Sequence, residues 1–173
     1  KSFDISEDLS ALSKSPGIVI SAGAKAILDL EKTVETLESF GVTVLGFRTN
    51  DFPAFYSQSS GIKNIVSVQS EEEIVNVFVS NKELGLSTSI LIVNPVPKKD
   101  EIPSADIKNI IDKATKEAKK QSISGNKLTP FLLQFVVKKT KKKSLMVNKA
   151  LALNNIKLGI SISKKLSKRK VQK

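Results

Sequence analysis

The sequence predicts an α/β protein: an α-β-α layering around a central, largely parallel or mixed sheet, with a helical C-terminal end. Three observations support this class. Gly17–Phe47 has the pattern of a strand, a helix and a second strand. Ser89–Val93 is a short apolar run bounded by turn residues, which is typical of a buried strand. From Ser104 onward, apolar residues recur at helical spacing.

The strand–helix–strand unit is the clearest signal. Gly17–Ser21 and Val42–Phe47 are the two expected strands. Between them, a helix is expected from about Lys25 to Phe40, with Gly41 at the position of a C-terminal capping glycine. Its apolar face is formed by four residues at spacings of three and four: Ile27, Leu30, Val34 and Leu37.

The remaining elements follow from caps and turn residues. Arg48–Gly61 is a long polar and aromatic loop, and long loops in compact domains are often functional. Ser70 and Glu73 form a capping box that opens a helix, Glu71–Leu84. Three further helices are expected: one capped by Ser104 and ending near Gln121, one beginning at Thr129–Pro130, and one capped by Ser144 and ending near Ile162.

Composition restricts the chemistry that this chain supports. Its 173 residues suffice for a single core, and they contain no cysteine and no histidine. Disulfides, thiol nucleophiles and thiolate or imidazole metal sites are therefore excluded, and any metal must be a hard, oxygen-liganded ion. Apolar runs such as Ile90–Val93 are far too short to span a membrane.

The net charge of +11 comes from one end of the chain. Residues 138–173 hold 13 Lys and Arg and no Asp or Glu, so residues 1–137 carry 15 basic and 17 acidic groups. None of the nine aromatic residues lies in this basic stretch, so stacking platforms for single-stranded nucleic acid are missing. A solvated lysine-rich end is the favoured interpretation, and no specific nucleic-acid partner is expected.

Lys25 is the first candidate for chemistry. It stands among small and apolar residues directly after a strand, where α/β proteins place ligands. We expect Lys25 to lie at the first turn of a helix and to be partly buried. Both effects would favour the neutral form of its amine, which is the form that attacks a carbonyl. A plain surface lysine and an anion-binding lysine at the helix end are the alternatives.

Three further groups are candidates, each with a structural alternative. If the segment is extended, Asp4, Ser6 and Asp8 share one face and offer oxygens for a hard cation or a sugar, but Asp and Ser are also common where helices begin. Asn148 lies among apolar residues near the start of the last helix. Its side chain is either a substrate contact or a structural amide with its hydrogen bonds satisfied. The aromatics of Phe52–Tyr56 form either loop packing or a substrate wall.

A colinear string of motifs resembles one family. It begins with Ser-Ala-Gly-Ala-Lys-Ala-Ile-Leu-Asp-Leu, Thr-Val-Glu-Thr-Leu-Glu and Gly-Val-Thr-Val-Leu-Gly-Phe. It continues with Asp-Phe-Pro-Ala-Phe-Tyr, Ser-Gly, Leu-Gly-Leu, Asn-Pro-Val-Pro, Leu-Thr-Pro-Phe-Leu-Leu and Asn-Lys-Ala-Leu-Ala-Leu-Asn-Asn. Over roughly Phe3 to Ile160 the chain is similar to the pseudouridine-5′-phosphate glycosidases, also called the indigoidine synthase A-like family.

The resemblance implies cleavage of pseudouridine 5′-phosphate to uracil and ribose 5-phosphate, reversibly, by a cytoplasmic homotrimer. It implies that Lys25 forms a Schiff base with C1 of the ring-opened ribose and that Asp4 is linked to manganese. It places Ser6, Glu7 and Asp8 against the substrate, together with Asn148. Two departures from the family pattern are small: Ser21 stands for a cysteine and Ala26 for a serine.

The same resemblance implies that this chain is the C-terminal half of the domain, over residues 1–162, followed by a basic tail, 163–173. Family members are longer, and their N-terminal half carries the catalytic glutamate; Glu31 is not that residue, because it lies within a helix after Lys25. We therefore expect the chain to be inactive alone. Alternatives are a degenerate, non-enzymatic subunit of the family and a nucleic-acid-binding module.

Overall fold

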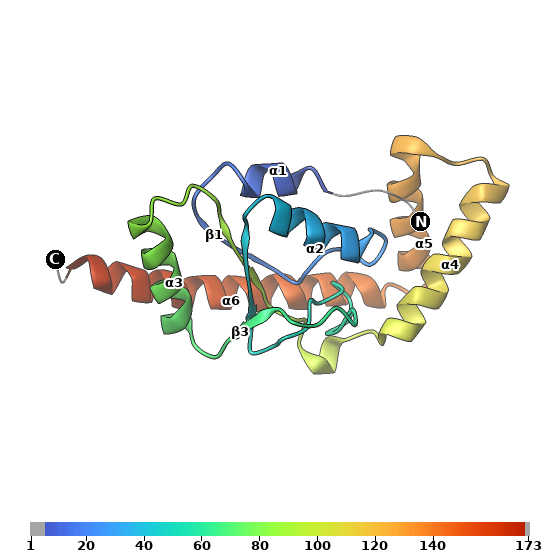
Figure 1. Ribbon diagram of the computed structural model, residues 1–173. Helices are drawn as coiled ribbons and strands as arrows, with labels where there is room; N and C mark the ends of the chain where they lie inside the picture. The colour runs from blue at the N-terminus through green and yellow to red at the C-terminus, as the bar shows by residue number, and fades with distance from the viewer. Residues whose placement is uncertain (1–5, 172–173) are drawn as a thin grey trace.

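Four parallel strands form a single sheet in the computed structural model, which describes residues 6–171 (Figure 1). Across the sheet the strands are ordered β1 (Ile18–Ser21), β4 (Ile90–Val93), β2 (Thr43–Phe47) and β3 (Val66–Val68). All three strand pairings are parallel, so the four carboxyl ends meet at one edge. The predicted α/β class with a largely parallel sheet between helices is confirmed.

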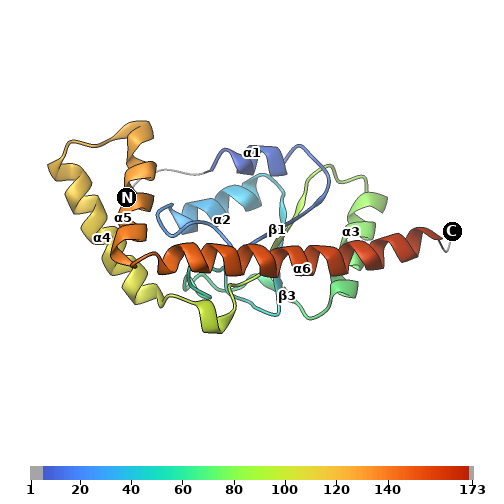
Figure 2. The same cartoon turned by 180° about the vertical axis from the view of Figure 1, so that it is seen from behind.

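Helices cover both faces of this sheet (Figures 1 and 2). Helices α1 (Asp8–Leu12) and α2 (Leu30–Ser39) lie on one face, and α3 (Glu71–Glu83) and α6 (Lys143–Val171) lie on the other. All four residues of strand β4 are apolar and buried, and their side chains alternate between the two faces, so both faces of the sheet are apolar there. Ile90 and Ile92 pack with α3 and α6, whereas Leu91 and Val93 pack with α1 and α2.

Two more helices lie beyond the carboxyl edge of the sheet. Helices α4 (Ser104–Lys120) and α5 (Leu128–Lys139) pack against each other, with the short 3₁₀ turns η1 (Lys98–Asp100) and η2 (Gly125–Lys127) leading into them (Figure 1). Ile107 of α4 and Val136 of α5 are buried in a cluster with residues that follow β1 and β4. Among the described helices, none has both the length and the apolar character that crossing a membrane requires.

Several predicted helix boundaries were wrong. The helix expected from Lys25 begins at Leu30, because the Asp29 side chain accepts a hydrogen bond from the Lys32 N–H (3.1 Å) and caps it there. Pro103, not Ser104, precedes the first residue of α4, and α5 begins at Leu128. The one-residue shifts of α4 and α5 lie within the usual uncertainty of helix ends, whereas the five-residue shift of α2 exceeds it.

Two elements were not predicted. The edge strand β3 has three residues, and Val66 is 65% exposed, so the segment has too little buried surface to show a strand pattern. Helix α1 has five residues and one buried side chain, Leu9. Both are short elements whose position depends on the sheet that they contact.

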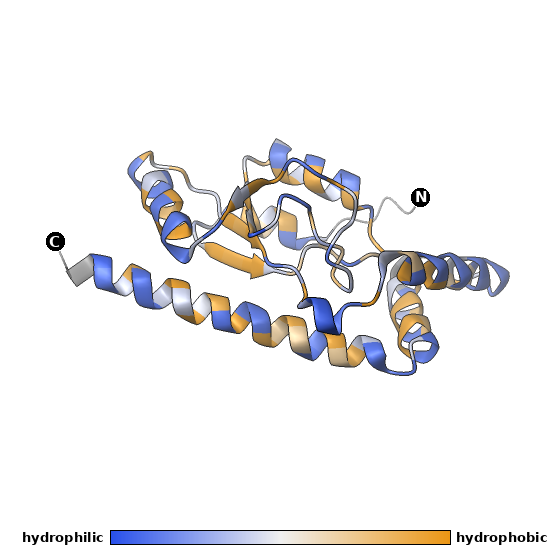
Figure 3. Ribbon diagram, turned by 90° about the horizontal axis from the view of Figure 1, so that it is seen from below, coloured by the Kyte–Doolittle hydropathy of each residue, from blue (hydrophilic) through white to orange (hydrophobic). Residues whose placement is uncertain are grey.

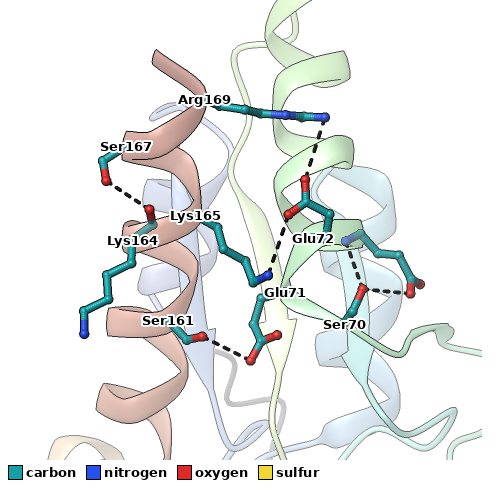
Figure 4. Close-up of polar contacts among 9 residues, drawn as sticks. Ser70, Glu71, Glu72, Ser161, Lys164, Lys165, Ser167 and Arg169 are labelled. Carbon is teal, nitrogen blue, oxygen red and sulfur yellow. Dashed lines mark hydrogen bonds and ion pairs between the residues drawn. The ribbon is translucent and has the colours of Figure 1, made fainter. Parts of the chain in front are cut away.

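The last helix is longer than expected at its C-terminal end. It begins at Lys143, with Ser144 buried inside its first turn, and runs past Ile162 to Val171. Figure 4 shows one reason: Lys165 and Arg169 contact the Glu72 carboxylate of α3 at 3.7 and 3.9 Å. The Ser161 hydroxyl donates to Glu71 (3.2 Å), and the pKa of that carboxyl is lowered, chiefly by its own backbone N–H and then by Ser161.

The carboxyl end of β1 is fixed by a close contact of two backbones. Gly23 has φ +80° and forms an antiparallel bridge with Ala54 of the long loop. A Cβ on Gly23 would lie 1.8 Å from the carbonyl oxygen of Pro53, so no larger residue fits. The Phe55 N–H donates to the Ala22 carbonyl oxygen (3.0 Å) and holds the loop on the same segment. This contact determines where the chain runs two residues before Lys25.

We expect Gly23→Ala to lower the free energy of unfolding by about 2 kcal/mol or more, because the new Cβ meets backbone and the conformation is left-handed. Gly17→Ala is the matched control, since a Cβ there meets nothing within 4 Å. Urea unfolding of both variants measures the difference. Equal stabilities would show that the Pro53 loop moves freely away from β1.

Candidate active site

Lys25 lies at the carboxyl edge of the sheet, in the segment that joins β1 to α2. It is exposed, and its carbonyl oxygen accepts a hydrogen bond from the Leu28 N–H (2.9 Å) in a turn. The expected position at the first turn of a helix, and the expected partial burial, were both wrong: α2 begins five residues later, and neither a helix terminus nor burial acts on this amine in the described residues. The expected placement after the first strand is correct.

Asn148 lies in the second turn of α6, and its side-chain oxygen is unusual. The Oδ1 atom is buried and accepts no hydrogen bond from the described residues. A buried acceptor without a partner costs about 1–3 kcal/mol, so folded proteins rarely keep one without a reason. Of the two interpretations of Asn148, a satisfied structural amide does not agree with this geometry.

One apolar cluster brings the neighbours of Lys25 and of Asn148 together. We call it the edge cluster, and its buried members are Ala22, Tyr56, Val96, Ile102, Ile107, Val136, Val147 and Leu151. Ala26, directly after Lys25, packs against it, and Val147 directly precedes Asn148. Each candidate is therefore next in sequence to a residue of the same cluster, although the two are 123 positions apart in the sequence.

Tyr56 is the aromatic residue at the centre of this arrangement. It is 3% exposed and stacks edge to face with Phe55, with ring centroids 5.0 Å apart. Burial raises the pKa of its phenol, so the group stays protonated and able to donate at neutral pH. Of the loop aromatics, Tyr56 thus combines core packing with a polar group at the carboxyl edge.

Two side-chain amides hold α6 at this edge. Asn94, which follows β4 and is buried, donates to the Asn155 side-chain oxygen (3.0 Å), and Asn154 donates to the Pro95 carbonyl oxygen (3.1 Å). Asn148 lies seven residues before Asn155, about two helical turns or 10 Å along α6. The two amide contacts therefore determine the position of Asn148 along the axis of α6, relative to the edge cluster.

An open groove starts beside the Lys25 segment. It has a volume of ≈ 270 Å³ and is lined by twelve residues, among them Ala26, Ser57, Ser59, Ser104 and Lys108. The lining combines serine hydroxyl groups and the Lys108 ammonium, which suit sugar hydroxyls and phosphate, with the Asp112 carboxylate, which can accept hydrogen bonds from sugar hydroxyls. Sequence reasoning missed Ser104 and Lys108 as candidates, because nothing in their local pattern shows that α4 lies across the chain from Ala26.

The described part of this segment, residues 6–8, leads directly into a helix and is not extended. Asp8 is the first residue of α1, the Ser6 hydroxyl donates to the Asp8 carboxylate (2.9 Å), and the Asp8 N–H donates back to that hydroxyl (3.3 Å). Ser6 and Asp8 thus interact at a helix start, as the alternative interpretation expected, with Glu7 exposed between them. Their described hydrogen bonds do not reach Lys25 or Asn148.

The candidate metal ligand cannot be placed, because Asp4 lies outside the described residues. Within residues 6–171 no three acidic side chains gather into a group that would hold a metal ion. Glu7 is the carboxylate nearest to Asp4 in the sequence and is exposed; Asp8 follows it, and Ser6 already engages one of the Asp8 oxygens. Hard ions such as magnesium and manganese often take one or two carboxylates and complete their shell with water and substrate phosphate, so an Asp4-centred site has suitable chemistry.

The parallel sheet with a polar groove and an unpaired acceptor at its carboxyl edge is the arrangement of an α/β ligand-binding or catalytic protein. Residues 1–165 match the family described as "Indigoidine synthase A like protein". The chain belongs to the indigoidine synthase A-like family.

Curated relatives carry one name. The chain is 45% identical over 168 residues to a "Pseudouridine-5′-phosphate glycosidase" of Caldanaerobacter subterraneus subsp. tengcongensis, covering 97% of this chain and 55% of that protein. It is 44% identical to a protein of the same name from Staphylococcus aureus, covering 96% and 54%. The chain spans about half the length of the curated relatives that it matches.

Two solved structures share the fold. An indigoidine synthase A-like protein of Thermotoga maritima superposes with a TM-score of 0.84 at 37% identity, over 94% of this chain and 54% of that one. A prealnumycin C-glycosynthase in complex with ribulose 5-phosphate superposes with a TM-score of 0.93 at 25% identity, over 98% and 56%.

We expect Asn148→Leu to leave the free energy of unfolding within about 1 kcal/mol of the parent, or to raise it, because the replaced oxygen has no partner. Asn154→Ala is the comparison: it removes the hydrogen bond to Pro95 and should cost about 1–2 kcal/mol. Thermal and urea unfolding measure both. A large loss of stability in Asn148→Leu would mean that Asn148 is a structural amide.

Proposed function

We propose that this chain supplies the lysine-bearing part of a pseudouridine-5′-phosphate glycosidase, with Lys25 as the nucleophile. The enzyme would break the carbon–carbon bond between uracil and ribose 5-phosphate, reversibly. Membership of the family and the shared name of the curated relatives support the substrate. The observation that supports the site is geometric: Ala26 and Val147, the sequence neighbours of Lys25 and Asn148, pack in one cluster, and the Asn148 oxygen is buried without a partner among the described residues.

A C-glycoside needs a lysine for a chemical reason. It has no oxygen or nitrogen leaving group that a pair of carboxylates could protonate, as ordinary glycosidases do. The ribose ring opens when the bond from C1 to the ring oxygen breaks and that oxygen takes a proton. The Lys25 Nζ then bonds to C1 and gives up a proton. The bond from C1 to uracil then breaks, its electron pair stays with uracil, and the uracil carbon takes a proton. The imine left on Lys25 is hydrolysed by water, which releases ribose 5-phosphate.

The neighbouring residues have matching roles in this proposal. Asn148 would accept a hydrogen bond from a substrate hydroxyl or from a uracil N–H, which satisfies its buried oxygen. The groove with Ser104 and Lys108 would take the phosphate end, in line with the sugar phosphate bound by the C-glycosynthase. Ser6, Glu7 and Asp8 would contact the substrate.

Metal, acid and assembly complete the proposal. Asp4 would hold one manganese ion, which supplies positive charge to the phosphorylated substrate. The proton donor would come from the part of the family proteins that this chain does not span. We further propose a cytoplasmic homotrimer as the working form. The chain by itself would therefore show little or no glycosidase activity.

Lys25→Arg tests the nucleophile in a chimera in which this chain replaces the matching residues of the Caldanaerobacter relative. Arginine keeps the charge but cannot form an imine, so turnover should fall by on the order of a thousand-fold, about 4 kcal/mol in barrier. Borohydride trapping of ribose 5-phosphate should also be lost. Lys14→Arg, at an exposed position on another segment, should leave both unchanged. A trapped adduct mapped by mass spectrometry to another lysine would contradict the assignment.

Asp4→Asn in the same chimera tests the metal site. Removing the carboxylate should raise the manganese concentration needed for half-maximal activation by about tenfold or more, because an amide oxygen is a weaker ligand for a hard ion. Glu83→Gln, an exposed carboxylate at the end of α3, is the control and should leave the titration unchanged. An unaltered manganese titration in Asp4→Asn would place the metal in the other part of the protein.

A further inference from the structure

Helix α6 has two apolar stripes, and only one of them is covered in the described structure. The covered stripe packs on the sheet and the edge cluster through Val147, Leu151, Leu158 and Ile162. The other, which we call the outer stripe, consists of Leu145, Met146, Leu153, Ile156 and Ile160. Its members are between 43% and 71% exposed, and they make up five of the ten exposed large hydrophobic residues among those described.

The spacing of the outer stripe is that of a helix-packing seam. Met146, Leu153 and Ile160 recur every seven residues, and Ile156 falls between the last two, as in the apolar positions of a heptad. From 145 to 160 the stripe is about 22 Å long. Figure 2 shows α6 in front of the sheet with no other described helix or strand across it, and apolar segments recur along α6 in Figure 3. Large apolar patches on the surface of a folded protein commonly mark interaction sites.

The charges beside the outer stripe restrict what covers it. From residue 143 to 171 the sequence contains no Asp or Glu. Lys149 lies within the stripe, and Lys157 and Lys164 lie along one side of it, all exposed. Two copies of α6 placed seam to seam would bring these like charges together, which is unfavourable. A fitting partner is therefore an apolar helix face flanked by carboxylates.

The lengths of the family proteins indicate where that partner comes from. The matched region is 55% of the Caldanaerobacter relative and 56% of the C-glycosynthase chain, so close to half of each protein lies outside it. Apolar faces of secondary-structure elements are buried against other elements of the same protein, so the remainder is a source of helices that could cover the outer stripe. We propose that the outer stripe of α6 is the docking surface for an acidic-flanked amphipathic helix from this remaining part of the family polypeptide. The inference rests on family membership and does not depend on the proposed reaction.

The absence of cysteine in the chain permits a direct test of burial. Ile156→Cys places a single thiol on the outer stripe, and Leu84→Cys places one at the end of α3, where Leu84 is 75% exposed. Each is made in the 173-residue chain and in the chimera with the Caldanaerobacter relative, whose own cysteines are replaced by serine. The rate of alkylation by a maleimide is then measured for all four proteins.

We expect alkylation at position 156 to be about tenfold or more slower in the chimera than in the chain alone, because the thiol is reached only when the docked helix opens. Alkylation at position 84 should be equally fast in both. Equal rates at position 156 would overturn the proposal. The alkylation rate does not depend on glycosidase activity. Equal rates at position 156 would therefore not affect the assignment of Lys25 as the nucleophile, and an incorrect assignment of Lys25 would not affect the docking proposal.

A second copy of the chain is the competing occupant, and sedimentation separates it. We expect the chain alone to be monomeric at micromolar concentration, both as the parent and as Leu153→Glu. An oligomer of the parent that Leu153→Glu dissociates, while the matched Leu84→Glu variant stays assembled, would assign the stripe to self-association and overturn the proposal. Folding of both variants is checked by circular dichroism, so that unfolding is not mistaken for dissociation.

Discussion

The packing of α6 across one face of the sheet is the interaction on which the rest of the structure depends. Leu158 and Ile162 close the hydrophobic core between β4 and α3. The Asn94–Asn155 hydrogen bond then fixes the helix along its axis at the carboxyl end of β4. Because a helix is rigid over this length, the same contact sets the position of Asn148 at the edge cluster and of Lys165 beside α3.

This dependence explains what could and could not be predicted from the sequence. Local signals were sufficient for β1, β2 and β4 and for the Ser70 capping box, where the Ser70 hydroxyl accepts from the Glu73 N–H (3.3 Å). The extension of α6 to Val171 was missed, since Lys165 and Arg169 gain their partner from Glu72, far away in the sequence. Patterns of period two and 3.6 contain no information on such contacts.

The candidate site shows the same division. Its location after β1 follows from the rule that ligands bind at the carboxyl ends of parallel strands, and the sequence supports that step. The exposed surroundings of Lys25 could not be predicted from the sequence pattern. The Asp29 side chain caps α2 four residues after Lys25, so the lysine lies before the helix and not within its first turn. Asn148 was a candidate from its apolar surroundings, with two interpretations open, whereas its unpaired oxygen is visible only once α6 is packed.

An exposed Lys25 and an unpaired Asn148 are consistent with each other if the site is completed by further chain. The small residues around Lys25 and the left-handed Gly23 keep the backbone close to the Pro53 loop without covering the amine. A nucleophilic amine works best in dry surroundings, where it is not fully hydrated, and the described residues do not enclose it. The same helix that carries Asn148 presents an uncovered apolar seam. A segment docked on the outer stripe would lie on the same helix as Asn148, so the two incomplete features, the uncovered stripe and the unpaired oxygen, belong to one element.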